Sequence, residues 1–523
     1  MHVLAYLFNW EKNMENFDVI VIGGGNGGLA STATLAEKGK KVILFEKHNI
    51  PGGCGTSFRR GRFEFEVALH QLSSLGSKEK PGDLRKQFRR YGIEDQINWI
   101  EIKELFRVNF NDGTGVSLPS DKEKCIRFLG EEFPNERENI KRYFDVVYKF
   151  CDEAAAFAAK SAESTSEPSV IKKQIMKMGF PKIYPTLAEY GLKSTEEVLN
   201  DFFKDKKLQL ALSAYWCFMG VSPKRFPFSI LAKCTNFYIE DKPYYMEGTS
   251  MMMNQAIMEA AIRMGATVKL NCGINKILVQ NGKAYGVIDE FGNEYHAKKI
   301  ISNISPIHTY GALMDEKDVP KEAREYLKPY TVGISAITCF IGLDCTPEEI
   351  GFTTSFTLNY KEMDPEKAYK DAYKLLPEND ALVATCYTVD DPSVSPKGTS
   401  VITAGTLKYG EEWEKLSPEQ YYEAKYEAGR RIVARLEELY PGITEHIEEM
   451  EIATPLTHMR YLNHPGGAIY GYEQDLNQSV FFFPNESKLK NLEFASGWVN
   501  ACGFGPNYLY ADKMATKIAK ELD

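Results

Sequence analysis

Residues 17–28, which read FDVIVIGGGNGG, constrain the fold more than any other part of the chain. The run from Asp18 to Ile22 is short, apolar and β-branched, as the central strand of a parallel sheet requires. Gly23, Gly25 and Gly28 then follow the G-x-G-x-x-G spacing of a dinucleotide-binding turn. Because such glycines allow a tight turn, a close approach to a pyrophosphate and close helix–strand packing, the segment predicts a Rossmann-type α/β domain.

The residues after the glycines complete a strand–helix–strand unit. A helix is predicted from about Gly28 to Lys38, with its positive N-terminal end directed at phosphates. Gly39 ends this helix, and residues 41–45 (KVILF) form a second strand that leads into Glu46. An acid at this distance from the glycines binds the ribose hydroxyls of a dinucleotide. The alternative, an α/β turn without a ligand, explains the ordered series of elements less well than a nucleotide site.

A second glycine pair, Gly52-Gly53, favours FAD over NAD. The segment KHNIPGGCGTSF follows Glu46, whereas a plain NAD domain would continue into another helix and strand. A glycine pair lets the backbone pass close to a long, extended dinucleotide. The predicted cofactor is therefore FAD, and the residues expected around it in this part of the chain are Gly23, Gly25, Asn26, Gly27, Gly28, Glu46, Lys47, Gly52, Gly53, Cys54, Thr56 and Ser57.

Composition excludes several other classes of protein. The 72 acidic side chains outnumber the 63 basic ones, and this net charge of -9 argues against a nucleic-acid-binding protein. The ten cysteines are scattered without C-x-x-C pairs, so we expect reduced thiols, no metal site and a cytoplasmic location. No run of 18 apolar residues predicts a membrane span. Residues 1–13 lack the features of a signal peptide, and we interpret them as an extension outside the fold.

Six further blocks occur in a specific order along the chain. They are PGGCGTSFRRGRFEFEVALHQL (51–72), KLQLALSAYWCFMGVSPKRFP (207–227), YYMEGTSMMMNQAIMEAAIRMGATVKLNCGINKI (244–277), DDPSVSPKG (390–398), TPLTHMRYLNHPGGAIYGYEQ (454–474) and NLEFASGWVNACGFGP (491–506). With these blocks the chain resembles the phytoene desaturase, carotenoid isomerase and retinol saturase family of FAD-dependent oxidoreductases, within the amine-oxidase-like group. The resemblance covers nearly the whole chain from Phe17.

The resemblance implies further cofactor contacts near the C-terminus. The backbone near Ile274 would hold the adenine, and the last block would close over the flavin. A helix from about Asn507 to Leu522 would place its N-terminus near the pyrophosphate or the flavin. The family usually has an acid where this chain has Trp498, and it usually has Asp, Gly and Gly where this chain has Glu66, Ala68 and Glu247. The residues expected at this part of the site are Ile274, Gly497, Trp498, Gly505, Pro506 and Asn507.

The same resemblance implies two interleaved domains. A discontinuous FAD-binding domain with a parallel sheet is predicted over 14–124, 243–310 and 450–523. An inserted α+β substrate domain with a helical cap is predicted over 125–242 and 311–449, and the substrate would lie at the junction of the two. We interpret 161–183, rich in Ser and Lys, as part of a solvated cap, with a mobile lid or a membrane-facing helix as the alternative. Peripheral membrane contact is therefore left open, as is the oligomeric state.

The expected activity is reduction, desaturation or isomerisation of carbon–carbon double bonds in an apolar small molecule such as a polyene, an isoprenoid or an unsaturated fatty acid. Hydride would move between the flavin and a substrate carbon, and His70 or Glu247 would handle the proton. His70 is a candidate because the ordinary pKa of histidine is near neutrality. The alternatives are amine oxidation on the same fold and a non-catalytic, prenyl-binding protein of the GDP-dissociation-inhibitor type.

Overall fold

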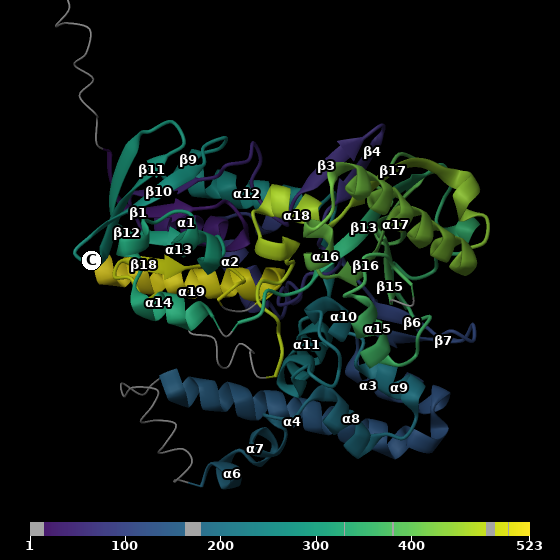
Figure 1. The fold of residues 1–523 in the computed structure, drawn as a ribbon. Coiled ribbons are helices and arrows are strands. Elements are labelled where there is room, and N and C mark those ends of the chain that lie inside the picture. Colours follow the sequence, from purple (N-terminus) through teal and green to yellow (C-terminus); the bar gives the residue numbers. More distant parts are fainter. Residues whose placement is uncertain (1–14, 163–178, 329, 379–380, 477–486, 500–501) are drawn as a thin grey trace, which may run out of the picture.

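The computed structural model describes residues 15–162, 179–328, 330–378, 381–476, 487–499 and 502–523. The predicted extension 1–13 and most of the segment 161–183 lie outside the described residues. Two large sheets and a group of helices make up the described part, with the helices around α4 (Arg137–Ala162) at the bottom of Figure 1.

The first sheet begins with β1 (Glu15–Ile22), which lies between two parallel neighbours, β2 (Val42–Phe45) and β12 (Glu294–Ser302). The strand β9 (Thr267–Lys269) extends it in parallel beside β2, and β18 (Leu492–Phe494) pairs in parallel with β12. Its other edge is the antiparallel hairpin of β10 (Ile274–Gln280) and β11 (Lys283–Asp289). The Rossmann-type prediction is confirmed, although the sheet is mixed rather than wholly parallel.

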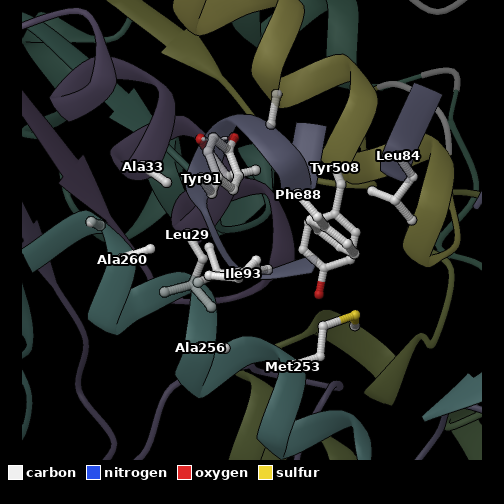
Figure 2. Close-up of a cluster of buried hydrophobic side chains, with 14 of the residues drawn as sticks. Leu29, Ala33, Leu84, Phe88, Tyr91, Ile93, Met253, Ala256, Ala260 and Tyr508 are labelled. Atoms are coloured by element: carbon white, nitrogen blue, oxygen red, sulfur yellow. Dashed lines mark hydrogen bonds between the residues drawn. The ribbon is translucent and has the colours of Figure 1, made fainter. Parts of the chain in front are cut away.

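Helices from both ends of the chain pack against each other beside this sheet. They are α1 (Asn26–Glu37), α2 (Asp83–Tyr91), α12 (Ser250–Arg263) and α19 (Phe504–Leu522). Figure 2 shows their buried side chains meeting in one cluster, which includes Leu29 and Ala33 of α1, Phe88 of α2 and Met253 of α12. Tyr508 of α19 is fully buried there, and its hydroxyl donates to Asn254 (2.6 Å). The C-terminal helix is thereby fixed against the glycine-rich turn.

The second sheet has the strand order β17-β13-β16-β15-β14-β6-β7. All its neighbours are antiparallel except β14 and β6, which are parallel. The strands are β6 (Glu104–Asn109), β7 (Gly115–Pro119), β13 (Ser335–Leu343), β14 (Phe356–Asn359), β15 (Leu382–Cys386), β16 (Ser400–Lys408) and β17 (Ile447–Ala453). The long helix α17 (Pro418–Leu439) packs against β13 and β17.

The helical cap packs its buried aromatic side chains against β6, β7 and β14, where it forms a separate core. Its helices are α3 (Lys122–Glu132), α4, α6 (Phe180–Ile183), α7 (Pro185–Tyr190), α8 (Thr195–Phe202), α9 (Lys206–Leu212), α10 (Trp216–Met219) and α11 (Phe228–Glu240). Shorter elements complete the described chain: the strand pairs β3 (Ser57–Arg60)–β4 (Phe63–Glu66) and β5 (Trp99–Glu101)–β8 (Tyr244–Met246), and the helices α13 (Pro306–Gly311), α14 (Lys321–Leu327), α15 (Pro365–Asp371), α16 (Glu411–Glu414) and α18 (Pro455–Leu462).

Two details differ from the sequence predictions. The strands β6 and β7 lie within 14–124, the range given to the nucleotide domain, but they pair in the second sheet. The helix α19 begins at Phe504 rather than at Asn507. Pro506 lies in its first turn, where the missing backbone N–H removes no helical hydrogen bond, so the proline does not delay the start of the helix.

One clamp joins the cap to the chain that follows Gly471. Arg225, between α10 and α11, donates through Nε to Asp475 and through Nη2 to Glu473, both at 2.7 Å. Its Nη1 donates to the hydroxyl of Tyr369, also at 2.7 Å. The carboxylates of Glu473 and Asp475 are nearly buried, whereas a third of the Arg225 side chain is exposed. Tyr369 and Tyr409 also donate to Glu473, so three segments distant in sequence meet here.

Candidate active site

A cavity of about 650 Å³ extends from the β1–α1 turn to the cap and the second sheet. Its nucleotide-motif end is lined by residues after β1, β2 and β12 and by the start of α19. Its other end is lined mainly by apolar and aromatic side chains, among them Tyr215, Phe218, Met219, Ile230, Phe237, Tyr238, Val383 and Leu407. One continuous cavity therefore joins the glycine motif to an apolar pocket.

The β1–α1 turn has no room for side chains at its central glycines. Gly23 has φ +94°, in the left-handed region that favours glycine. A Cβ on Gly28 would lie 1.9 Å from the carbonyl oxygen of Gly23, and one on Gly27 would lie 2.0 Å from that of Ala495. Gly23, Gly25 and Asn26 line the cavity, whereas Gly27 and Gly28 are packing residues behind it.

Glu46 lies at the end of β2 and lines the cavity. Its two carboxylate oxygens accept backbone N–H groups of Gly24 (2.6 Å) and His48 (2.8 Å). These bonds orient the carboxylate, and each oxygen retains a second lone pair for a ligand hydroxyl. The carboxylate therefore lies at the cavity beside the first glycine turn, and its ribose-binding role stays a prediction.

The Gly52-Gly53 pair lies directly against the first glycine turn. Gly52 donates its backbone N–H to Gly24 (2.8 Å), and both glycines of the pair have positive φ, +114° and +59°. A Cβ on Gly53 would lie 3.3 Å from Cα of Gly25, so the two turns approach each other closely. Gly53 and Cys54 line the cavity, and burial raises the pKa of the Cys54 thiol to about 11.

Thr56 and Ser57, also expected at the cofactor, are not among the cavity-lining residues. The Ser57 hydroxyl donates to Glu64 (2.6 Å) in the β3–β4 hairpin, because the chain turns away from the cavity after Gly55. The hydroxyl of Thr56 is buried without a protein partner in the described chain.

The C-terminal segment supplies another wall of the cavity. Gly497, Trp498, Gly505, Pro506 and Asn507 all line it, and Asn507 donates its side-chain N–H to the carbonyl of Ala495 (3.0 Å). Trp498 is 2% exposed and meets the rings of Tyr472 and His464 edge to face. A neutral, packed indole therefore occupies the place where an acid is usual in the resembled family.

Asn303 and His308 line the cavity but belong to none of the sequence blocks, whereas Asn463 and His464 lie in the 454–474 block without a predicted role. Asn303, after β12, places Nδ2 3.4 Å from the Gly23 carbonyl, and a Cβ on Gly25 would be 2.8 Å from this Nδ2. His308, Asn463 and His464 line the same end as Ile274, which was expected there. Single polar side chains on loops leave no periodic signal, so only the folded chain shows that they meet.

His70 lies in the cavity, where its Nδ1 is 2.8 Å from the Thr385 hydroxyl and 3.1 Å from that of Tyr387. Enclosure among these side chains, Phe218 and Phe356 lowers its pKa to about 4. The imidazole is therefore neutral at pH 7. This pKa lies below the ordinary value of histidine because the site desolvates the ring without giving it a carboxylate partner.

Glu247 does not reach the cavity. It lies between β8 and α12, its side chain is exposed, and its carboxylate accepts from Asn98 (2.7 Å). The neighbouring Gly248 has φ +90° and donates its N–H to Asp391 (2.9 Å), so this turn holds the Glu247 side chain on the outer surface. The structure thus separates the two candidate acids, His70 and Glu247.

The buried carboxylate of Glu66, at the end of β4, binds the N-terminus of α12. Its carboxylate accepts from the backbone N–H and hydroxyl of Ser250 (2.6 and 2.7 Å) and from the N–H groups of Ala68 and Leu69 (3.1 and 3.0 Å). Burial is the largest influence and raises its pKa. The extra methylene of Glu relative to Asp is explained by this reach to the helix N-terminus.

Away from the cavity, Asp344, Cys345 and His446 place their ligand atoms within 4.8 Å of one another. His446 Nδ1 already bonds Asp344 (2.8 Å), which satisfies the pair without an ion.

In the described ranges, no helix is long and apolar enough to cross a membrane.

Comparison with known proteins gives relatives over nearly the whole chain. Residues 21–87 match the NAD(P)-binding Rossmann-like domain. Prolycopene isomerase 1 from an Oncidium hybrid cultivar is 27% identical over 88% of this chain and 76% of its own length. All-trans-retinol 13,14-reductase from Danio rerio is 26% identical over 96% of this chain and 86% of its own.

Solved structures confirm the fold. Putrescine oxidase bound to putrescine superimposes with a TM-score of 0.64 at 14% identity, over 97% of this chain and 99% of that one. Cyclohexylamine oxidase from Brevibacterium oxydans has a TM-score of 0.56 at 12% identity, over 97% and 99%. The architecture is therefore that of the amine-oxidase-like proteins. The sequence relatives, a carotenoid isomerase and a retinol reductase, are similar to this chain over most of its length.

Proposed function

We propose that this protein is an FAD-dependent oxidoreductase that reduces, desaturates or isomerises carbon–carbon double bonds in an apolar polyene, isoprenoid or unsaturated fatty acid. One observation carries the proposal: the cavity is continuous from the glycine motif to a pocket of apolar and aromatic side chains. The relatives support the substrate class, because prolycopene and all-trans-retinol are both polyenes.

The residues of the motif end fit a dinucleotide. A Cβ on Gly25 would meet Asn303, and a Cβ on Gly53 would meet Gly25. The backbone at both glycines is therefore free of side chains, which leaves room for an extended ligand. Ile274 would hold the adenine, Glu46 the ribose, and the N-terminus of α1 the pyrophosphate. The segments at Gly497 and Tyr470 both line the cavity, and we expect them to border the flavin. When bound, FAD supplies hydride transfer.

The apolar end orients the substrate and excludes water. Glu46 is the one carboxylate among the described lining residues, and it lies at the motif end. A cationic amine would therefore enter a pocket without an acidic partner, at a considerable desolvation cost. This observation favours a hydrocarbon-like substrate over amine oxidation. The intact glycine cradle likewise favours a cofactor-dependent enzyme over a non-catalytic prenyl-binding protein.

We infer that Tyr470 and His70 are the polar groups that contact the substrate or the flavin. Tyr470 lines the cavity among the side chains of Cys54, Cys234, Cys502 and Tyr238, and burial holds its pKa well above 10. Its phenol is thus protonated at neutral pH and donates a hydrogen bond. His70 is neutral, so it positions the substrate or accepts a hydrogen bond rather than acting as a strong acid.

Absorption spectroscopy tests the proposal first. The purified protein, supplied with FAD and desalted, should retain the absorption bands of bound flavin, and their absence would refute the redox function. The second stage incubates the oxidised protein and, separately, the anaerobically reduced protein with polyenes, isoprenoid alcohols, unsaturated fatty acids and amines, because desaturation and amine oxidation need oxidised flavin whereas double-bond reduction needs reduced flavin. Products with altered double bonds are expected from the first three classes. Flavin turnover with amines alone would show that the substrate class is wrong.

A further inference from the structure

Lys47 is a cation at the motif end of the cavity without a carboxylate partner. It follows Glu46 after β2, is exposed, and lines the cavity. Its ammonium makes no ion pair within the described ranges of the chain. Partial burial, opposed by the charge of Glu46, lowers its pKa. A side chain in this position is available to a ligand of opposite charge.

Two histidines share this end with Lys47 and carry no compensating negative charge. Lys47, His308 and His464 all line the cavity. Burial lowers the pKa of both histidines most, and the positive charge of Lys47 also lowers them. His464 Nδ1 is 2.7 Å from the carbonyl of Ala468, and His308 Nε2 is 3.1 Å from the side-chain nitrogen of Asn463. Neither contact adds a negative charge.

The N-terminus of α1 adds positive potential at the same end. This helix of 12 residues begins after Gly25 with no side-chain cap and no acid in its first turn. Its free N–H groups and its dipole favour an anion there. The second glycine turn, Gly52 to Cys54, supplies bare backbone but no cation. Glu46, the carboxylate at this end of the cavity, already accepts two backbone N–H groups.

We propose that Lys47, flanked by His308 and His464, binds the pyrophosphate of the dinucleotide together with the N-terminus of α1. The group recognised is a pyrophosphate diester with two negative charges. The site brings together Lys47 after β2, His308 of α13 and His464 after α18. The assignment rests on the proposed function only in that the cavity holds a dinucleotide. An ammonium is a point charge that binds phosphate oxygens without demanding one geometry.

Equilibrium titration of the cofactor-depleted full chain tests this assignment. Dissociation constants for FAD, NADH, NADPH and riboflavin are measured by ligand fluorescence for the wild type, Lys47→Met, Lys47→Arg and Lys298→Met. Lys298 provides the control, because it carries the same charge on β12 but pairs with Asp18 outside the cavity. Lys47→Met should weaken FAD binding about 10- to 100-fold, as expected for a charged hydrogen bond.

Riboflavin lacks phosphate, so its affinity should be the same for all four proteins, and Lys47→Arg should recover most of the FAD affinity. Equal FAD affinity in Lys47→Met and Lys298→Met would overturn the assignment and leave the proposed function intact. A Lys47→Met defect of the same size for riboflavin would also overturn it, because it would indicate damage to the whole cavity. If no dinucleotide binds the wild type, both proposals are wrong.

Discussion

Replacing Arg225 with Met should loosen the contact between the helical cap and the chain that lines the cavity. The substitution keeps an unbranched side chain of similar length but removes the charge shared by Glu473 and Asp475. Both carboxylates are nearly buried, at 3% and 7% side-chain exposure, so water cannot fully replace the guanidinium. The loss should therefore exceed that of a surface ion pair.

The expected magnitude follows from these contacts. Three hydrogen bonds to charged groups at about 1.5–3 kcal/mol each set an upper limit for the loss of unfolding free energy. A third of the Arg225 side chain is exposed, and Tyr369 and Tyr409 still donate to Glu473 after the change. We therefore expect about 3 kcal/mol, the lower end of the range for a broken buried ion pair.

Urea denaturation followed by tryptophan fluorescence measures this loss. The control is Arg62→Met, which removes an ion pair with Glu448 whose side chains are 47% and 39% exposed. Because solvent screens this exposed pair, the control should lower the free energy of unfolding much less than Arg225→Met does. Tyr470 and Gly471, which line the cavity, lie just before Glu473 in the chain. Loosening Glu473 by Arg225→Met should therefore also weaken cofactor retention. Equal losses of unfolding free energy in the two variants would refute the reasoning.

Three further outcomes are expected. Gly28→Ala should lower the free energy of unfolding by about 3 kcal/mol and abolish flavin binding, because the added Cβ would lie 1.9 Å from backbone. Gly311→Ala, where the added Cβ meets open space, should change the free energy of unfolding little. The free energy of unfolding should fall as pH drops from about 6.5 to about 4, because His458 and His464 have pKa values near 4 when folded and near 6.5 when unfolded. His458→Asn should reduce this pH dependence, measured by urea denaturation. For the neutral His70, kcat should stay constant from about pH 5.5 to 8, and an inflection near 6.5 that His70→Gln removes would contradict this.

Local chemistry explains why parts of the fold were predictable. The hairpin of β10 and β11 turns at Asn281 and Gly282, which both have positive φ, as a two-residue turn of this type requires. The β1–α1–β2 unit was predictable for a similar reason, because Gly23 has a positive φ and side chains at Gly27 and Gly28 would clash with nearby backbone. In both segments the determining residues are neighbours in sequence.

Features that depend on distant residues were not predictable. The parallel pairing of β6 with β14 joins segments 250 residues apart, as in the contact between Asn109 and Asn359, and no local pattern marks such a partner. The low pKa of His70 likewise arises from Thr385 and Phe356, which belong to the second sheet. Glu247 was a candidate acid in the sequence, but the turn at Gly248 places its side chain on the outer surface.

The place of β18 in the first sheet has a consequence for the synthesis of the protein. β1 leaves the ribosome early, yet its neighbour β12 is completed on its outer side by Leu492–Phe494, and α1 packs against the last helix, α19. At about 5–20 residues per second, tens of seconds separate the emergence of these partners. The apolar face of α1 therefore remains uncovered until residues 504–522 have been synthesised. We expect stable cofactor binding at the glycine-rich turn only after that point.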